Sequence, residues 1–345
     1  MKSNKKIVYI VVLGLLFAAA LILMGTSLGS SNINLKNAIQ IIIGKIFSLD
    51  LSGFEKSEIT ILWEMRIPRM ILALAVGGGL AVAGVAMQSL TQNVLAEPYI
   101  LGVSSGASVM VSLAFLLFGG KALLSVIVPT FAFVGALLAM VTVYIISMQG
   151  ENTSTNNLVL TGMAISIILN ALSNMIITML PNAFIMQTAA MWMWGSLSGA
   201  RWNNILLPVV ASVLIMTIFS IFGNQFDLFS LGEETAITLG IDTAKFKKII
   251  IIMISILVGI IISSSGLIGF VGFIIPHTTR LIFGSKNRSL FVLSFITGGL
   301  FLGVMDILSR VLLAPREISI GIFSAFFGGP FFIFLIIRKR RQGKC

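Results

Sequence analysis

Apolar runs of about 20 residues recur along the whole chain and are separated by short polar segments. A helix rises about 1.5 Å per residue, so roughly 20 such residues cross the apolar core of a bilayer, which is about 30 Å thick. Charged residues make up only 10% of the sequence, against about 25% in ordinary soluble domains. The pattern predicts an all-α polytopic membrane protein that forms a single transmembrane domain over residues 1–345.

Ten spans are predicted. The first follows the basic stretch KSNKK and has the basic and apolar regions of a signal peptide. Its apolar run is near 20 residues, longer than the roughly 7–15 of a secretory signal, so a retained helix is expected instead. The nine further spans are 68–90, 98–118, 122–147, 157–180, 203–222, 246–265, 268–283, 290–309 and 319–337.

An even number of spans places both termini on one side of the membrane. Lysines near the N-terminus and the C-terminal RKRRQGK predict that this side is cytoplasmic, because Lys and Arg concentrate in cytoplasmic loops. Arg66 and Arg69 then lie outside, against that rule, and Pro68 between them is expected to mark the start of the second span. The outer loop, about 28–65, contains LKNAIQIIIGKIF, which is too short to cross and is expected to lie at the interface.

Several kinds of chemistry are excluded by what the sequence lacks. Cys345 is the only cysteine and His277 the only histidine, so thiolate clusters and His-rich metal sites cannot form within the chain. No GxxxxGK[ST] phosphate loop is present. The net charge of +11 comes from basic residues scattered between apolar runs and crowded at the termini, where topology and anionic lipid explain them without nucleic acid. No catalytic residue, metal site or cofactor is therefore predicted.

Acidic residues are nearly absent from the predicted spans. Asp306 is the one carboxylate placed inside a span, and Arg310 follows at i+4, a spacing that predicts a neutralising pair within one helix. A transporter of this kind must take its energy from partners, an ATPase inside and a protein that delivers substrate outside. The rival hypothesis is a secondary transporter driven by an ion gradient, which would need acids at mid-membrane. A membrane enzyme is a third alternative, and it lacks clustered histidines or carboxylates.

The longest polar interruption on the inner side is residues 223–248. Its apolar residues Leu228, Leu231, Ala236 and Leu239 have helical spacing, and the segment ends in lysines. Such an amphipathic element either docks a soluble partner or rests on the lipid headgroups.

A series of motifs runs in order through most of the chain. They are RIPRMILALAVGGGLAVAGVAMQ (66–88), NVLAEPYILGVSSGAS (93–108), LGEETAITLGI (231–241), GLIGFVGFIIPHTTRLIFGSKNRSL (266–290) and DILSRVLLAPREISIGIFSAFFGGPFF (306–332). Over about residues 60–337 the chain resembles the permease subunit of type II ABC importers for iron chelates, haem and cobalamin. The resemblance implies inward transport of a ferric siderophore across a bacterial cytoplasmic membrane, with haem or cobalamin as the alternative cargo.

The same resemblance implies partners. The permease would pair with a second permease subunit, identical or related, and with two cytoplasmic ATP-binding subunits. A short coupling helix within about 227–242 would meet each ATPase. The matching positions are Gly232, Glu233, Ala236, Leu239 and Gly240, with Glu233 expected to meet a basic group on the ATPase.

On the outer side, relatives use arginines to pair with acidic residues of an extracytoplasmic substrate-binding protein. The matching positions are Arg66, Arg69 and Arg310, expected at a solvent-exposed rim. The alternatives are that Arg66 and Arg69 reach up to lipid headgroups and that Arg310 only neutralises Asp306. Thr155 and Asn156 match a region that narrows the pathway in relatives.

Overall fold

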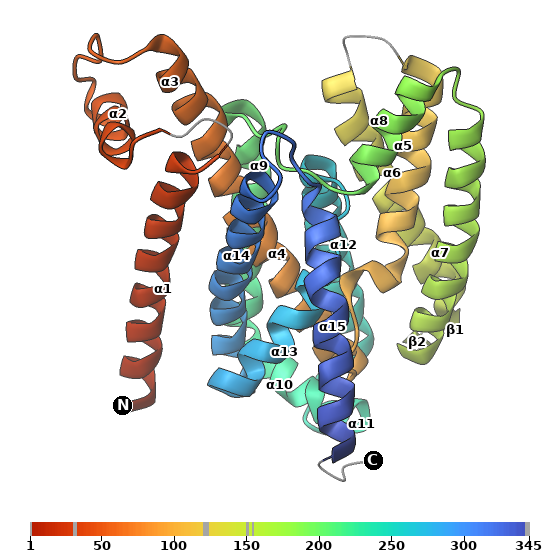
Figure 1. The fold of residues 1–345 in the computed structure, drawn as a ribbon. Coiled ribbons are helices and arrows are strands. Elements are labelled where there is room, and N and C mark those ends of the chain that lie inside the picture. The colour runs from red at the N-terminus through yellow and green to blue at the C-terminus, as the bar shows by residue number, and fades with distance from the viewer. Residues whose placement is uncertain (1, 30–32, 120–123, 150–151, 154, 342–345) are drawn as a thin grey trace.

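The computed structural model describes residues 2–29, 33–119, 124–149, 152–153 and 155–341, and this part is almost entirely helical (Figure 1). Seven helical segments in it are long and apolar enough to cross a membrane. The predicted all-α membrane fold is therefore confirmed. The main helices of these segments are α1 (Lys2–Ser27), α4 (Ile67–Thr91), α6 (Leu124–Ser147), α7 (Thr155–Thr178), α9 (Trp202–Ile221), α12 (Thr243–Ser265) and α14 (Asn287–Val311).

The other three predicted spans coincide with α5 (Val103–Phe118), α13 (Val271–Phe283) and α15 (Ile320–Arg341). The span predicted over 98–118 starts late because Pro98–Leu101 forms a 3-10 turn, η2, and Gly102 follows it with a φ of 74°. A positive φ favours glycine and stops a right-handed helix, so α5 begins only at the next residue. One further short helix, α8 (Ala183–Met193), was not among the predicted spans.

The segment predicted as an outer loop is largely helical. α2 (Leu35–Phe47) is too short to cross, as expected, whereas α3 (Lys56–Thr60) and the π-helical turn η1 (Ile61–Arg66) run straight into α4. α4 itself begins at Ile67 with Pro68 in its first turn, as predicted, but the helical path begins earlier, at Lys56. In η1 the N–H of Ile67 donates to the carbonyl of Leu62, five residues back. This widened turn shifts the hydrogen-bond pattern just where proline lacks an N–H, so the helix continues through it.

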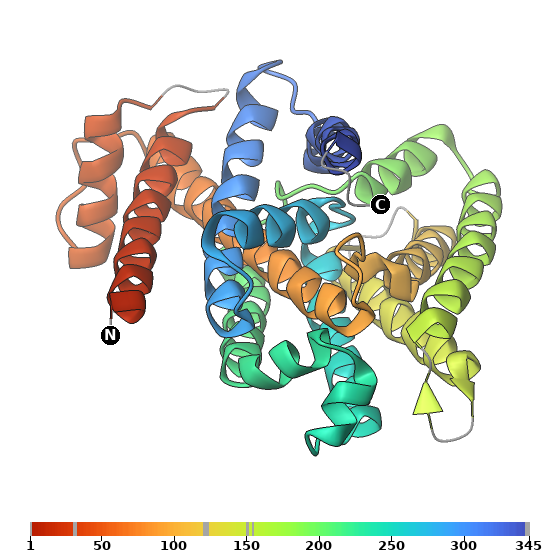
Figure 2. The ribbon, with the colours of Figure 1, turned by 90° about the horizontal axis from the view of Figure 1, so that it is seen from below.

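The core is built around α4, which is covered by α9, α12, α13 and α14 (Figures 1 and 2). Glycines let α4 and α14 touch through their backbones: a Cβ atom on Gly77 would overlap the carbonyl oxygen of Gly298. Gly84 meets the backbone of Gly272 on α13 in the same way. Such close approach is how helices gain dispersion contacts in lipid, where no hydrophobic force drives them together.

The two ends of the bundle differ. The start of α1 and the end of α15 lie at one end, together with α10 (Gly223–Ser230) and α11 (Glu233–Thr238) (Figure 1). A two-residue antiparallel pair, β1 (Met148–Gln149) with β2 (Asn152–Thr153), lies toward that end as well. We call this the termini end. α2 and α3 lie at the opposite end, called here the α2 end. The start of α1 and the end of α15 at one end of the bundle agree with an even number of crossings.

Candidate functional site

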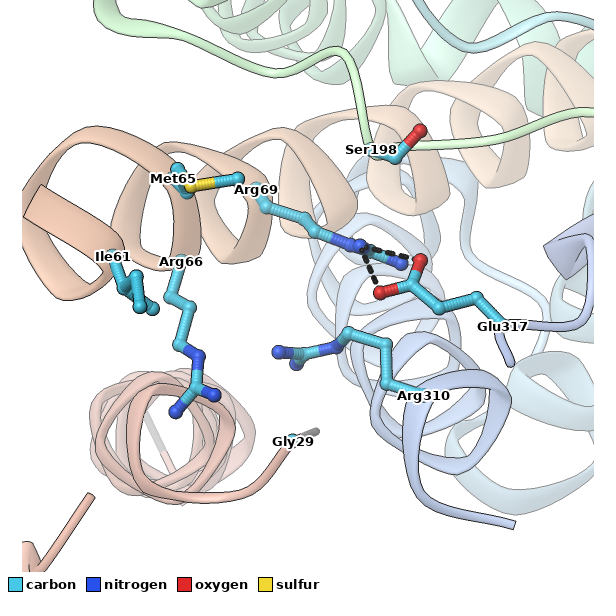
Figure 3. A pocket seen from close by; sticks show the side chains of 8 residues that line it. All are labelled: Gly29, Ile61, Met65, Arg66, Arg69, Ser198, Arg310 and Glu317. Carbon is cyan, nitrogen blue, oxygen red and sulfur yellow. Dashed lines mark hydrogen bonds and ion pairs between the residues drawn. The ribbon is translucent and has the colours of Figure 1, made fainter. Parts of the chain in front are cut away.

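A cavity of about 350 Å³ lies at the α2 end, where α4 begins and α14 ends (Figure 3). All three arginines predicted to dock a partner lie in its wall, although they come from distant parts of the sequence. The lining residues are Gly29, Ile61, Met65, Arg66, Arg69, Ser198, Arg310 and Glu317. We call this the arginine cavity.

Arg69, in the first turn of α4, is held by two carboxylates. Its Nε donates to Oδ1 of Asp306 at 2.8 Å, and its Nη1 donates to Oε2 of Glu317 at 2.9 Å. The side chain of Asp306 is fully buried, whereas that of Glu317 is 42% exposed. A buried carboxylate is tolerated only when it is paired with a positive charge. Asp306 therefore needs Arg69 as its partner, and in return it fixes the position of the Arg69 side chain.

Arg310 shares the same carboxylate. The ion pair predicted from the i+4 spacing is confirmed, with Arg310 Nε 3.1 Å from Oδ2 of Asp306. That Nε–H is aimed at the backbone carbonyl of Asp306, 3.3 Å away, and the pair with Oδ2 is therefore ionic rather than a hydrogen bond. Nη1 of Arg310 donates to the carbonyl of Gly25 in α1 at 3.1 Å.

Arg66 closes the end of α1. Its Nη1 donates to the carbonyl oxygens of Thr26 at 2.7 Å and of Ser27 at 3.3 Å. These are among the last carbonyls of the helix, which have no partner within it and carry the negative end of its dipole. Arg66 and Arg310 are only 6% and 4% exposed. The expectation of a solvent-exposed rim is therefore wrong for these two, because the end of α1 binds both.

The arginine cavity carries a net positive charge, since three arginines face the carboxylates of Asp306 and Glu317. Guanidinium groups hold carboxylates through two parallel hydrogen bonds and stay charged, so the cavity is suited to an anionic group. Within the described residues no group of three or more His, Cys, Asp or Glu side chains could hold a metal ion; Cys345 lies outside them. Glu317 was missed, although it sits in the terminal motif at the E of APRE.

The predicted coupling segment forms the six-residue helix α11 at the termini end. Gly232 precedes it with a φ of 123° and Gly240 follows it with a φ of 85°; both are conformations that favour glycine. Ala236 is fully buried. Three large apolar side chains are exposed around the helix: Leu231 (69%), Ile237 (55%) and Leu239 (57%).

Glu233 is paired within the chain. Its Oε1 lies 2.7 Å from Nζ of Lys247 on α12. The same ammonium lies 5.7 Å from the ring centroid of Phe229 on α10, a cation–π distance. This contact joins α11 to α10 and α12. The carboxylate expected to meet a base on a partner is thus already partnered, although the Glu233 side chain remains 40% exposed.

The two residues predicted to narrow the pathway lie at the start of α7. Asn156 is exposed, and Thr155 is the first residue of the helix, with a side chain outside the described part of the structure. Asn170 and Asn174, also exposed, lie 14 and 18 residues after Asn156. With 3.6 residues per turn these amides share one face of α7.

Comparisons with known proteins agree with this fold. Residues 15–338 match the FecCD transport family. The chain is 32% identical to the iron(3+)-hydroxamate import system permease protein FhuG of Bacillus subtilis, with 98% of each chain covered. It is 33% identical to the vitamin B12 import system permease protein BtuC of Vibrio vulnificus, over 88% of this chain and 90% of that one. A solved structure described as a metal-chelate type ABC transporter in an inward-facing conformation has a TM-score of 0.80 at 26% identity, covering 96% of this chain and 99% of its own. The chain belongs to the FecCD transport family.

Proposed function

We propose that the chain, as one transmembrane domain, is the permease subunit of an ATP-binding-cassette importer that moves a ferric siderophore inward. The family match over residues 15–338 carries the proposal, and the likeness to the hydroxamate permease FhuG supports this cargo. Members of this family are transport subunits rather than enzymes, and separate subunits hydrolyse the ATP. The importer would lie in a bacterial cytoplasmic membrane.

Both termini are proposed to be cytoplasmic. The start of α1 and the end of α15 lie at the same end of the bundle (Figure 1). Exposed basic residues gather there as well, among them Lys245 and Lys248 at the start of α12 and Lys286 just before α14. Cytoplasmic loops are rich in Lys and Arg, so the termini end would face inward and the arginine cavity outward.

The ATP-binding subunits would dock at α11. Leu231, Ile237 and Leu239 expose large apolar side chains around α11 at the termini end, and apolar side chains exposed there favour a protein contact. The buried Ala236 and the ion pair from Glu233 to Lys247 would hold the helix against the bundle. The complete importer would contain two permease subunits, identical or related, and two ATPases.

The substrate-binding protein would dock over the arginine cavity through acidic side chains. Arg69 is the most exposed of the three arginines, at 11% of its side chain, and its outer partner Glu317 is 42% exposed. Arg66 and Arg310, which are more deeply buried and hold the end of α1, would add positive charge to the cavity. The pairs would guide encounter and register more than they add affinity.

The translocation pathway would follow the face of α7 that carries Asn156, Asn170 and Asn174. Exposed amides in a span are costly against lipid, where nothing can hydrogen-bond to them. A water-filled path beside a second permease subunit satisfies them. Thr155 and Asn156 would narrow its cytoplasmic entrance.

Two alternatives are kept. Haem or cobalamin could be the cargo of the same machine, and the likeness to the vitamin B12 permease BtuC supports cobalamin as that alternative. An ion-driven secondary transporter needs an acid that is free to bind its ion. Asp306 is held between Arg69 and Arg310, and Glu97 accepts the N–H of Phe270 at the start of α13 at 2.8 Å.

The test is uptake into proteoliposomes that hold the permease and its ATP-binding subunits, supplied with loaded binding protein outside. Accumulation is expected with ATP inside and is expected to stop when the ATPase carries an inactivating substitution. The matched control imposes a proton or sodium gradient without ATP. Accumulation driven by that gradient alone would contradict the importer proposal and would support the secondary transporter.

A further inference from the structure

A second hollow, of about 230 Å³, lies between α1, α4, α9 and α14, well away from the arginine cavity. Every side chain that lines it is apolar. We call it the α1–α14 groove. Its lining residues are Val11, Gly14, Leu15, Ala18, Leu74, Met216, Val292, Phe295, Ile296 and Gly299.

The groove is formed by two facing helical stripes. The four residues from α1 have the spacing i, i+3, i+4 and i+7, and the four from α14 repeat that spacing. The two helices pack closely on either side of the hollow: a Cβ atom on Gly14 would lie 2.5 Å from Cγ2 of Ile296, and one on Gly303 would lie 2.5 Å from Cδ2 of Leu21. The hollow is therefore a built feature of the α1–α14 packing.

The groove is within reach of the lipid. α1 stands at the edge of the bundle in both views (Figures 1 and 2), and Leu13, Leu16 and Phe17 beside the groove are 42%, 62% and 59% exposed. Water has no polar partner in such a hollow. If the groove were empty, its lining side chains would lose dispersion contacts. A hydrocarbon chain from the bilayer would restore these dispersion contacts and would need no polar partner in the groove.

A positive charge stands at one end of the same stripe. Arg288 precedes Val292 by four residues on α14, which is one helical turn, about 6 Å, toward the termini end. The residue is exposed, and Ser220 on α9 fixes its backbone by donating to its carbonyl at 2.8 Å. No ion pair of its guanidinium is found among the described residues.

We propose that the α1–α14 groove binds an acyl chain of an anionic phospholipid whose phosphate pairs with Arg288. Arginine suits the phosphate because its planar group donates two parallel hydrogen bonds, and anionic headgroups gather at the cytoplasmic surface. The bound lipid would fasten α1, the least buried of the seven candidate spans among the described residues, to α14. The inference rests on the proposed orientation, with the termini end at the cytoplasmic surface, and does not depend on the cargo.

Native mass spectrometry of the full chain tests the acyl-chain site. The protein, in a mild detergent, is given equal amounts of phosphatidylglycerol and phosphatidylcholine, and the retained lipid is counted. Wild type is expected to retain phosphatidylglycerol about tenfold over phosphatidylcholine, which corresponds to about 1.4 kcal/mol. Ala18→Phe fills the groove and is expected to abolish retention. Ala19→Phe, on the exposed neighbouring residue outside the groove, is the matched control and is expected to retain lipid like wild type.

A second pair of variants tests the headgroup without touching the groove. Arg288→Gln is expected to lose the preference for phosphatidylglycerol while still retaining lipid of either kind, and Lys286→Gln is expected to keep the preference. Equal retention by Ala18→Phe and wild type would overturn the acyl-chain site. An unchanged preference in Arg288→Gln would overturn the pairing with phosphate. A wild-type protein that holds no lipid but forms a dimer sensitive to Ala18→Phe would assign the groove to a second copy of the chain instead.

Discussion

Nε of Arg69 lies 2.8 Å from Oδ1 of Asp306, and this contact joins α4 to α14 across 237 residues of sequence. The Asp306 side chain is fully buried, and Arg310 approaches its other oxygen to 3.1 Å. Through Arg66 and Arg310 the same cluster holds the last carbonyls of α1. Only Glu317 extends from it toward solvent. The cluster therefore has a structural part at its base and one exposed carboxylate at its mouth.

Asp306→Asn is expected to destabilise the protein strongly. The substitution keeps the size of the side chain but leaves Arg69 and Arg310 without the charge between them, and breaking a buried pair typically costs about 3–5 kcal/mol. Glu317→Gln, the matched change at the exposed end, is expected to cost under about 1 kcal/mol. Thermal unfolding of the two variants in one detergent measures the difference, and similar midpoints would show that Asp306 is not the structural centre.

The affinity for the binding protein is expected to change in opposite directions when Arg69 and Glu317, which form the outer ion pair, are neutralised one at a time. Arg69→Gln removes the charge that would meet an incoming carboxylate, so the dissociation constant should rise about tenfold. Glu317→Gln removes the carboxylate that competes for Arg69, so the constant should fall. Surface plasmon resonance with immobilised permease measures both.

Ionic strength supplies the control for that pair of variants. Exposed charge pairs are screened over about 8 Å at physiological salt, so binding to wild type should weaken as salt is raised, and more steeply than binding to Arg69→Gln. Assembly with the ATP-binding subunits should be unchanged in both variants. Weaker capture by Glu317→Gln, or salt-insensitive capture by wild type, would contradict docking at the arginine cavity.

Exchanging the charges of Glu233 and Lys247 tests whether Glu233 acts by holding α11 in place or by contacting a base on the ATPase. Glu233→Lys alone should place two ammonium groups together and impair transport coupled to ATP hydrolysis. The double variant Glu233→Lys/Lys247→Glu restores the ion pair and should recover much of that activity, because the contact holds α11 in place. ATP-driven uptake measures this. No recovery would mean that Glu233 acts through a base on the ATPase instead.

Gly298→Ala is expected to destabilise the bundle by about 1–3 kcal/mol, the usual cost of overpacking. A Cβ atom at this position would overlap the carbonyl oxygen of Gly77 across the α4–α14 contact. Gly329→Ala, in α15, is the control because nothing lies within 4 Å of its Cβ position. That change should be neutral or slightly stabilising, since alanine favours helices more than glycine does. Equal effects on thermal unfolding would contradict the glycine contact.

Local patterns in the sequence predicted much of the structure. Runs of apolar residues located the spans, because the bilayer sets both their length and their composition. The pair of Asp306 with Arg310 was predictable because both lie on one helix and its pitch sets their distance.

Features that depend on distant segments were not predicted. The sequence does not indicate that Arg69 would share Asp306, because α4 and α14 meet only in the folded bundle. Burial of Arg66 follows from the end of α1 lying beside it. The helix through Pro68 depends on the π-helical turn before it, which has no simple sequence signal. Lys247 as the partner of Glu233 likewise requires the packing of α11 on α12.

Uptake by whole cells tests the central claim most directly. Cells that lack this chain, and the same cells with it restored, are given labelled iron bound to a hydroxamate siderophore, labelled haem or labelled cobalamin, each at limiting concentration. Restoring the chain is expected to restore accumulation of the siderophore-bound iron, and only while the partner ATPase is active. Restored uptake of haem or cobalamin with no change for the iron chelate would contradict the proposed cargo.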